Sequence, residues 1–251
     1  MSADDPIQTS SQGASVDGTS VLELGAGGKL LLLACNCIPL LQFVALAILT
    51  NVFYRRPFLC ISMELVSLYG VPPLLCRLVL ILFPLRREVI SAGSREFFVW
   101  WFTANLQVLF SRLPFLEELL RFIPGCYSFW LRLWGSKIGR LTYWAPGVRV
   151  LDRSFLRIGD DVIFGAGVLL NAHVLMRDDK GRAFLSLAPI SIGQGTLIGG
   201  YSLLTAGAQI APGEVTRAFL ILPPFTRVEQ GRRTKRGGFD PTTPEHSGPT
   251  T

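Results

Sequence analysis

The sequence from about Ile138 to Val215 repeats every six residues, and this repeat limits the possible fold more than any other feature of the chain. Each unit begins with a large apolar residue, usually has Gly or another small residue second, and carries Thr, Ser, Val or Ala fifth. The units begin at Ile138, Trp144, Val150, Ile158, Phe164, Leu170, Ile192, Ile198, Leu204 and Ile210. Such a unit holds one short strand and one tight corner and cannot bury its own apolar face, so the units must stack.

Three consecutive units make one coil of a prism. We therefore predict coils that begin at the first, fourth and seventh units, with the tenth unit opening another coil. The stretch from Met176 to Ser191 interrupts the repeat between the second and third coils. It contains Asp178-Asp179-Lys180-Gly181, a cluster of turn-forming residues that is typical of a β-hairpin.

The first half of the chain is unusually apolar. Hydrophobic residues make up 49% of the whole sequence, and the excess lies before the repeats. Residues 1–28 are the exception, because they are rich in Ser, Gly, Asp and Thr and are predicted to form a disordered tail. The run from Leu30 to Tyr54 has no charged residue and exceeds the roughly 20 apolar residues that a helix needs to cross a bilayer. We predict a transmembrane region over residues 29–88 that begins with this helix.

The second apolar run, from Phe58 to Leu85, contains Glu64 and Arg77 and is interrupted by Pro72-Pro73. Because proline lacks an amide donor and clashes with the preceding turn, the run is either a kinked second span or a helical hairpin that enters and leaves on one side. The hairpin places the arginine pairs that follow the two runs on the same side of the membrane, which the positive-inside rule favours. The two charges within the run either mark a substrate path or pair with each other.

Residues 89–134 interleave aromatic and basic side chains, and we predict helices that lie at the membrane interface. The same pattern occurs in proteins that bind single-stranded nucleic acid. The net charge of +6 comes largely from basic residues that flank apolar runs, which favours a membrane surface over nucleic acid. Residues 229–251 are predicted to be a disordered basic tail. The cysteines lie mostly within the apolar runs and do not form a disulfide framework.

A family resemblance is carried by the repeats together with Trp130-Leu-Arg-Leu-Trp-Gly-Ser-Lys-Ile-Gly, His173 and Ala188-Pro-Ile-Ser-Ile-Gly. These segments resemble the membrane-attached branch of the hexapeptide-repeat acyltransferases, and also the repeat domains of poly-amino-acid synthetases. The resemblance implies a mainly β fold class, with a left-handed parallel β-helix over residues 135–228 preceded by transmembrane and interfacial α-helices. It also implies a homotrimer with active sites between subunits, where an excursion like residues 176–191 covers a neighbour's site.

His173 is the candidate catalytic residue. The chain has two histidines, and the other, His246, lies in the polar tail. A corner position lets the His173 ring point out of the prism, just before the excursion. Acyl transfer from a thioester to a hydroxyl or amine needs a general base, and imidazole suits that role. The resembling acyltransferases use a histidine of the repeat surface in this way. The alternative is a structural histidine that bonds a neighbouring backbone carbonyl.

Two polar neighbours are candidates for supporting roles. Asn171 either binds the acceptor or bonds the corner backbone. Asp152 stacks one coil below, near Ala172, and either orients the His173 imidazole or pairs with Arg153. Of these two roles for Asp152 we prefer the pairing with Arg153.

Three glycines are candidates for binding the acyl donor. Gly207 stacks one coil above His173, where its N–H would hold the oxyanion of the reaction. Gly199 and Gly200 would line a groove for a pantetheine arm. Corners of a repeat fold need glycine in any case, which is the alternative explanation for all three.

The sequence thus predicts an acyltransferase that moves an acetyl or other short acyl group from an acyl-CoA to a hydroxyl or amine of a membrane-proximal acceptor. The co-substrate is acetyl-CoA or another acyl thioester, and no tightly bound cofactor is expected. No metal is expected either. Zinc-dependent carbonic anhydrases of this fold need three histidine ligands, and residues 135–228 contain one histidine. The expected location is the inner cell membrane, with the catalytic domain on the cytoplasmic face. The alternatives are aminoacyl or acyl transfer from a carrier protein, and a non-catalytic trimeric membrane scaffold.

Overall fold

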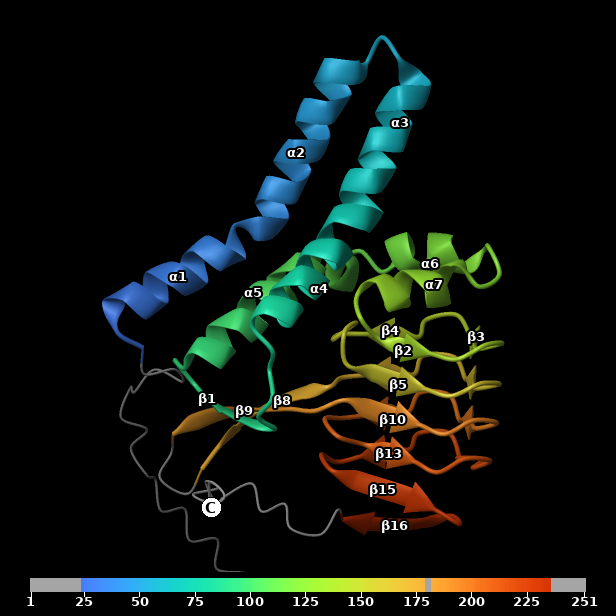
Figure 1. The fold of residues 1–251 in the computed structure, drawn as a ribbon. Coiled ribbons are helices and arrows are strands. Elements are labelled where there is room, and N and C mark those ends of the chain that lie inside the picture. The colour runs from blue at the N-terminus through green and yellow to red at the C-terminus, as the bar shows by residue number, and fades with distance from the viewer. Residues whose placement is uncertain (1–23, 179–181, 236–251) are drawn as a thin grey trace, which may run out of the picture.

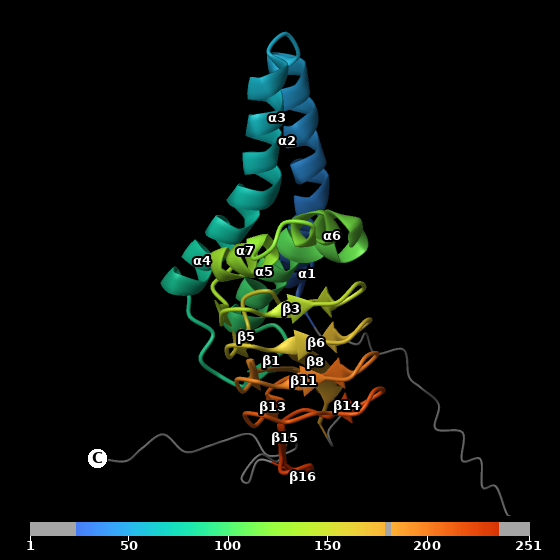
Figure 2. The same cartoon turned by 90° about the vertical axis from the view of Figure 1, so that its right-hand side faces the viewer.

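The computed structural model describes residues 24–178 and 182–235 (Figure 1). The helices are α1 (Ala26–Asn36), α2 (Ile38–Phe53), α3 (Pro57–Leu65), the π-helical turn η1 (Val66–Gly70), α4 (Val71–Leu82), α5 (Arg95–Arg112), α6 (Phe115–Arg121) and α7 (Cys126–Leu133). The strands are β1 (Val89–Ser91), β2 (Lys137–Ile138), β3 (Tyr143–Trp144), β4 (Arg149–Val150), β5 (Leu156–Ile158), β6 (Ile163–Phe164), β7 (Leu169–Leu170), β8 (His173–Arg177), β9 (Ala183–Leu187), β10 (Ile190–Ile192), β11 (Leu197–Ile198), β12 (Leu203–Leu204), β13 (Gln209–Ile210), β14 (Ile221–Leu222), β15 (Thr226–Glu229) and β16 (Arg232–Lys235). A prism of short strands forms the lower part, α5 to α7 lie over its upper end, and a helical pair projects above them (Figures 1 and 2).

Parallel sheets form the three faces of the prism. The first face is built from β2, β5, β10, β13 and β15, the second from β3, β6 and β11, and the third from β4, β7, β12 and β14. In the first face Ile138 lies beside Ile158, Ile158 beside Ile192, and Ile192 beside Ile210. These residues open the predicted coils, so the predicted register of a parallel β-helix is confirmed.

The first residue of each unit points into the prism, and this explains the apolar period. Phe164, Leu170, Ile198 and Leu204 are 0% exposed. Trp144 and Phe164 stack on adjacent coils, with ring centroids 4.5 Å apart and an angle of 9° between the planes. The prism interior is therefore filled by columns of apolar side chains that run along its axis.

The small second residue of each unit is explained by the spacing of the coils. A Cβ added at Gly139 would lie 2.3 Å from the backbone of Gly159, and one added at Gly193 would lie 2.3 Å from the amide nitrogen of Pro212. Real Cβ atoms do not approach backbone so closely. Glycine at these corners therefore serves close approach between coils.

Several boundaries differ from those predicted. Within the part of the chain that the structure describes, helices contribute more residues than strands, so a mainly β fold class is not clearly supported. Arg232–Lys235 forms β16, antiparallel to β15, although this segment falls in the predicted tail of residues 229–251. Helix α1 already begins at Ala26. Residues 1–23 and 236–251 of the two predicted tails lie outside the described residues.

Helices α5 to α7 cap the open end of the first coil, and many of their aromatic side chains are buried. Phe97, Phe110, Trp130 and Trp134 are at most 2% exposed, and the last three belong to the same apolar core as the prism interior. These aromatic residues pack within the chain, whereas we had predicted them at a membrane interface. The aromatic and aliphatic side chains that remain exposed on this cap are Phe115, Leu119, Phe122, Ile123 and Phe129.

A buried ion pair joins the cap to the prism. Arg153, in the corner after the first coil, is 1% exposed and donates from Nε to Glu117 of α6 at 2.7 Å. The hydroxyl of Tyr127 donates to the other oxygen of Glu117 at 2.7 Å. Burial and the neighbouring Glu117 carboxylate raise the pKa of Tyr127, so its hydroxyl keeps its proton and remains a donor. Gln107 of α5 accepts from the backbone N–H of Arg153 at 2.7 Å. These contacts fix the position of the aromatic cap on the first coil.

Two helical runs, Ala26–Phe53 and Pro57–Leu82, are long and apolar enough to cross a membrane by length and composition. Most of their large apolar side chains are exposed. The second run is one bent helix, Pro57–Leu82, in which α3, η1 and α4 follow without a break and Pro72 and Pro73 come directly after the π-helical turn η1. Prolines and π-helical turns are both common causes of helix bends. The hairpin that we favoured within residues 58–85 is therefore wrong.

Helices α2 and α3 pack side by side and meet at a tip that holds Arg55 and Arg56 (Figure 1). Arg86 and Arg87 follow α4 at the opposite end, close to the prism, so the two pairs do not lie on one side. Glu64 does not pair with Arg77. Its Oε1 accepts from the hydroxyl of Thr50 on α2 at 2.5 Å, and this bond joins the two apolar runs.

Candidate active site

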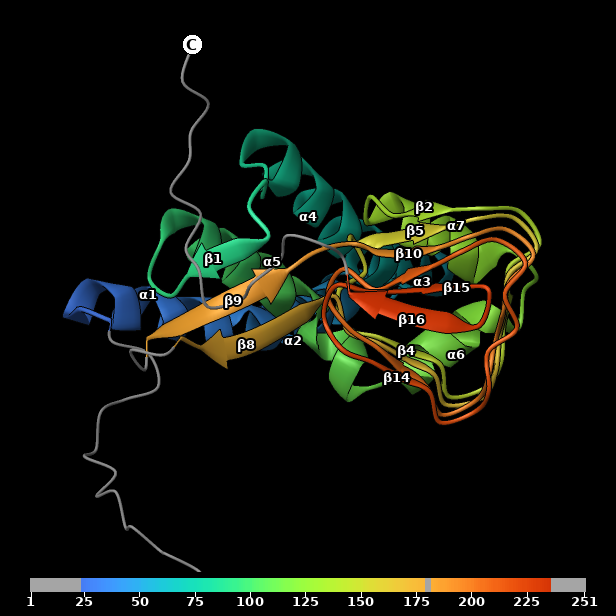
Figure 3. The ribbon, with the colours of Figure 1, turned by 90° about the horizontal axis from the view of Figure 1, so that it is seen from below.

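His173 begins β8 at the corner where the chain leaves the third face of the prism. Strands β8 and β9 then form an antiparallel hairpin that runs beneath α5, and β1 pairs with its other edge (Figure 3). The predicted hairpin is thus confirmed, although the excursion begins at His173 and not at Met176. Residues 179–181 of the predicted turn lie outside the described residues.

Asp152 holds the His173 ring. Its Oδ2 lies 2.7 Å from Nδ1 of His173, and the Asp152 side chain is 2% exposed. The preferred prediction, that Asp152 pairs with Arg153, is wrong. Because the guanidinium of Arg153 is turned toward Glu117, Asp152 is left to the imidazole. The less favoured prediction, in which Asp152 orients His173 from one coil below, is the arrangement found.

Trp100 of α5 is the third member of this cluster. Its indole N–H donates to Oδ1 of Asp152 at 3.4 Å, and its ring centroid lies 5.0 Å from that of His173. Trp100 is held by a small apolar core between α5 and the hairpin, in which Leu185 and Leu187 take part. Sequence reasoning missed Trp100, because a single tryptophan within an aromatic run carries no signal that distinguishes it from its neighbours.

The protonation of His173 follows from two opposing effects. Burial lowers its pKa, while the charge of Asp152 and the hydrogen bond to it raise the pKa by more, so the pKa lies above the ordinary 6.5. With Nδ1–H donating to the carboxylate, Nε2 of the neutral ring carries the lone pair. The His173 side chain is 27% exposed. The arrangement is therefore an oriented and partly accessible base.

The other predicted residues are placed differently. The backbone N–H of Asn171 bonds Leu204 O at 2.9 Å, while its buried side-chain oxygen has no hydrogen-bond partner among the described residues. The N–H of Gly207 donates to Ala188 O at 3.1 Å, so the prediction that it holds an oxyanion is wrong. Gly207 has a φ of 69°, which explains the glycine as a corner residue.

Gly199 and Gly200 do not lie at the corner of His173. They follow β11, between the second and third faces, whereas His173 follows β7, after the third face. The N–H of Gly199 is bonded to the hydroxyl of Thr216 at 3.0 Å. Within one chain, these glycines and His173 therefore belong to different corners of the prism.

Metal chemistry gains no support from the described residues. Over residues 24–178 and 182–235, no group of three or more His, Cys, Asp and Glu side chains is arranged to hold a metal ion. The polar cluster at His173 contains one imidazole and one carboxylate, which are hydrogen-bonded to each other.

No protein-family model and no curated protein matches the chain. Among solved structures it is similar to a hexapeptide-repeat-containing acetyltransferase from Vibrio cholerae O1 biovar eltor, complexed with acetyl-coenzyme A, at 18% identity and a TM-score of 0.34, covering 53% of this chain and 87% of that one. It is similar to a maltose O-acetyltransferase from Clostridium difficile 630 at 17% identity and a TM-score of 0.31, covering 52% and 88%. A galactoside acetyltransferase in complex with coenzyme A matches at 17% identity and a TM-score of 0.32, covering 48% and 76%.

The pKa of His173 gives a direct test of the pairing with Asp152. In the His246→Gln background one histidine signal remains, and its NMR titration should have a midpoint above pH 6.5. Asp152→Asn should move the midpoint below 6.5, because burial then acts without the carboxylate. The pairing also stabilises the fold below pH 6.5, and this contribution is lost as the pH rises through the folded-state pKa. An unchanged midpoint in Asp152→Asn would contradict the pairing.

Proposed function

We propose that this protein is a membrane-anchored acyltransferase that moves an acetyl or other short acyl group from an acyl-CoA to a hydroxyl or amine. The observation that carries the proposal is the His173–Asp152 pair, at a corner of a hexapeptide-repeat prism, with one imidazole nitrogen held and the ring partly exposed. An oriented neutral imidazole is what activation of an acceptor requires. Acetyl-CoA is the proposed co-substrate.

In the proposed reaction, Nε2 of His173 takes the proton from the acceptor as its oxygen or nitrogen attacks the thioester carbonyl. The tetrahedral adduct then collapses, the carbon–sulfur bond breaks, and the proton passes from His173 to the leaving thiolate. The products are the acylated acceptor and free thiol, and no covalent bond to the enzyme forms. Asp152 stabilises the imidazolium that exists between the two proton transfers.

The exposed apolar helices support attachment to a membrane. A helical pair whose large apolar side chains face outward is costly in water and stable in lipid. We place the protein in the inner cell membrane with the prism on the cytoplasmic face. The acceptor is then membrane-proximal.

A homotrimer is supported by an apolar stripe on the outside of the prism. The outward residues of the second face are Tyr143, Ile163 and Leu197, and Val215 bridges to Leu197. All four are exposed, at 38% or more. The rings of Tyr201 and Phe219 stack next to this face and are also exposed. In the proposed trimer a second copy covers this stripe.

The trimer can be broken by charge on the apolar stripe. Ile163→Lys with Leu197→Lys should give folded monomers, because both side chains point away from the prism core and a lysine cannot be buried unpaired between copies. Native mass spectrometry in detergent measures the subunit number. Gln209→Lys, an outward position on the first face, is the matched control and should remain trimeric. Persistent trimers in the double variant would contradict this interface.

Two other functions remain as alternatives. In the first, the donor is an aminoacyl or acyl thioester of a carrier protein, and the product is an amide. The protein can also be a non-catalytic trimeric scaffold at the membrane. Thiol release from acetyl-CoA by the purified full-length protein tests the proposal. No release with any acyl-CoA, alongside turnover of a carrier thioester, favours the carrier-dependent reaction, and turnover of neither favours the scaffold.

A further inference from the structure

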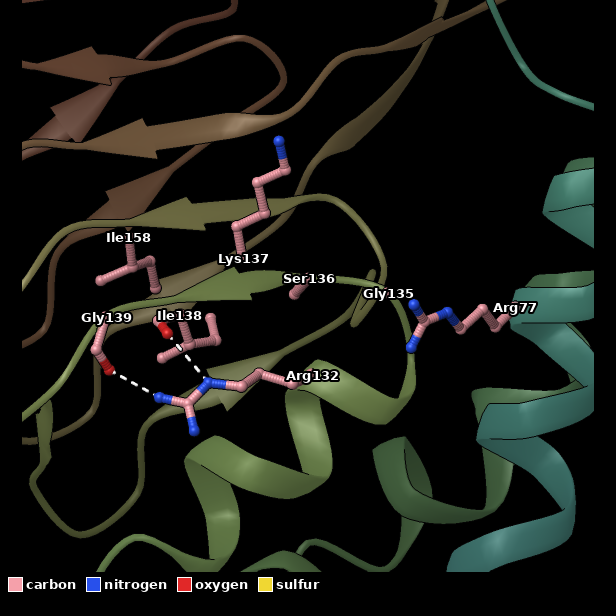
Figure 4. Close-up of a pocket in the computed structure, with 8 residues that line it drawn as sticks. All are labelled: Arg77, Arg132, Gly135, Ser136, Lys137, Ile138, Gly139 and Ile158. Carbon is pink, nitrogen blue, oxygen red and sulfur yellow. Dashed lines mark hydrogen bonds between the residues drawn. The ribbon is translucent and has the colours of Figure 1, made fainter.

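A basic pocket lies between the second apolar helix and the first coil of the prism, away from His173. Its volume is about 530 Å³, within the range of roughly 300–1,000 Å³ that small-molecule sites occupy. Arg77 of α4, Arg132 of α7 and Lys137 of β2 line it, together with the backbone of Gly135 and Gly139 (Figure 4). No carboxylate is among the residues that line the pocket.

The three cations differ in how firmly they are held. Arg132 is fixed, because its Nε and one terminal nitrogen donate to Ile138 O and Gly139 O, each at 2.9 Å. Arg77 extends from α4 toward Gly135, and the Lys137 side chain extends from β2 in a different direction from the Arg132 guanidinium (Figure 4). Among the described residues neither of these two forms an ion pair or side-chain hydrogen bond. The pocket thus offers one positioned guanidinium and two free positive groups.

A fourth cation, Arg157, is the neighbour of the pocket residue Lys137 in the sheet. Lys137 lies directly beside Arg157 of β5 in the parallel ladder, and both side chains are exposed. Like charges at directly paired positions destabilise a sheet. An anion bound near Lys137 would offset this repulsion.

Arg77 lies on a helix that also exposes an apolar surface. Cys76, next to it, contacts the hydroxyl of Ser154 at 3.4 Å and holds α4 against the prism. On the same helix Leu74, Leu78 and Ile81 are all more than half exposed, which forms an apolar stripe beside the pocket. Charge and apolar surface side by side are suited to a molecule with a phosphate head and a hydrocarbon tail.

We propose that this pocket binds a phosphate group through Arg77, Arg132 and Lys137. Guanidinium groups bind phosphate oxygens in pairs, and a lysine adds a point charge. The phosphate is that of a lipid headgroup or of a soluble phosphate compound, and the apolar stripe on α4 favours the lipid. This site is separate from the acyl-transfer site, and binding to it requires no turnover.

The test is calorimetric binding to the full-length protein in uncharged detergent, with three probes. Dihexanoyl phosphatidic acid represents a lipid phosphate, inorganic pyrophosphate represents a soluble one, and dihexanoylglycerol lacks phosphate. We expect the first or second probe to bind, and Arg77→Gln with Lys137→Gln to weaken that binding about ten-fold for each cation removed. Binding of phosphatidic acid alone identifies a lipid as the source, and comparable binding of pyrophosphate identifies a soluble compound.

Two controls separate this proposal from others. Arg217→Gln removes an exposed cation elsewhere on the prism and should leave binding unchanged. His173→Asn should also bind normally, so a failure of acyl transfer does not affect this result. The proposal is overturned if neither phosphate probe binds, if the Gln variant binds as well as the native protein, or if dihexanoylglycerol binds equally.

Discussion

His173→Asn is expected to reduce the rate of acyl transfer by about 10²–10⁴-fold, the usual contribution of a positioned general base. Asparagine keeps a hydrogen-bond donor for Asp152 but has no basic nitrogen, so the corner should retain its structure. The measurement is thiol release from acetyl-CoA with a saturating acceptor, once an acceptor that supports turnover is found. The loss should fall mainly on kcat, because the imidazole acts in the transition state.

The control for this experiment is to measure whether His173→Asn still folds and assembles. Because the His173 side chain is 27% exposed and asparagine keeps a donor for Asp152, His173→Asn should form the same oligomer with a similar melting temperature. Asp152→Asn should also slow turnover, since it removes the group that orients and charges the ring. Normal turnover in His173→Asn would show that another group is the base, and the proposed mechanism would then be wrong.

Glu117→Gln is expected to destabilise the protein by about 3–5 kcal/mol, which is the usual cost of leaving one partner of a buried ion pair alone. Arg153 is 1% exposed, and after the change its guanidinium would keep only the neutral partners Gln107 and Ser111. The melting temperature should fall on the order of 10 °C. Thermal unfolding followed by intrinsic tryptophan fluorescence measures it, because Trp130 and Trp134 lie in the adjoining core.

A carboxylate of an exposed ion pair and a double variant act as controls for the Glu117 experiment. Glu229→Gln removes one partner of the exposed pair between Arg227 and Glu229, whose side chains are 48% and 53% exposed, and should change stability by about 1 kcal/mol or less. Glu117→Gln combined with Arg153→Met should be less destabilising than Glu117→Gln alone, because no unpaired charge remains buried. Equal losses for Glu117→Gln and Glu229→Gln would argue against a structural role for the buried pair.

The repeat could be predicted with its register because each of its requirements is local. An apolar residue that opens every unit must face the interior, and a small second residue must allow the next coil to approach. Ile138 and Ile192 lie where the period placed them, on the same face. The hairpin after His173 was also predictable, since the cluster at residues 178–181 interrupts the period with turn-forming residues.

The sequence was least informative about pairing between charged side chains. It offered Arg153 as the partner of Asp152, because the two are adjacent in the chain. In the fold, successive corner residues point in different directions: Arg153 turns to Glu117 and Asp152 to His173. The partner on α6 is distant in sequence, and no local pattern could indicate it.

By itself, the sequence determined the period, the stacking of coils, the outward histidine and the two long apolar runs, because each depends on the spacing of apolar and small residues along the chain. Only the tertiary structure decided that Asp152 holds His173, that Trp100 covers the pair and that the N–H of Gly207 is already bonded to Ala188. It also assigned the buried aromatic residues to the cap of the prism. The physical reason is that hydrogen bonds and burial depend on which surfaces meet in space, and the packing of α5 to α7 against the first coil brings together residues that are far apart in the chain.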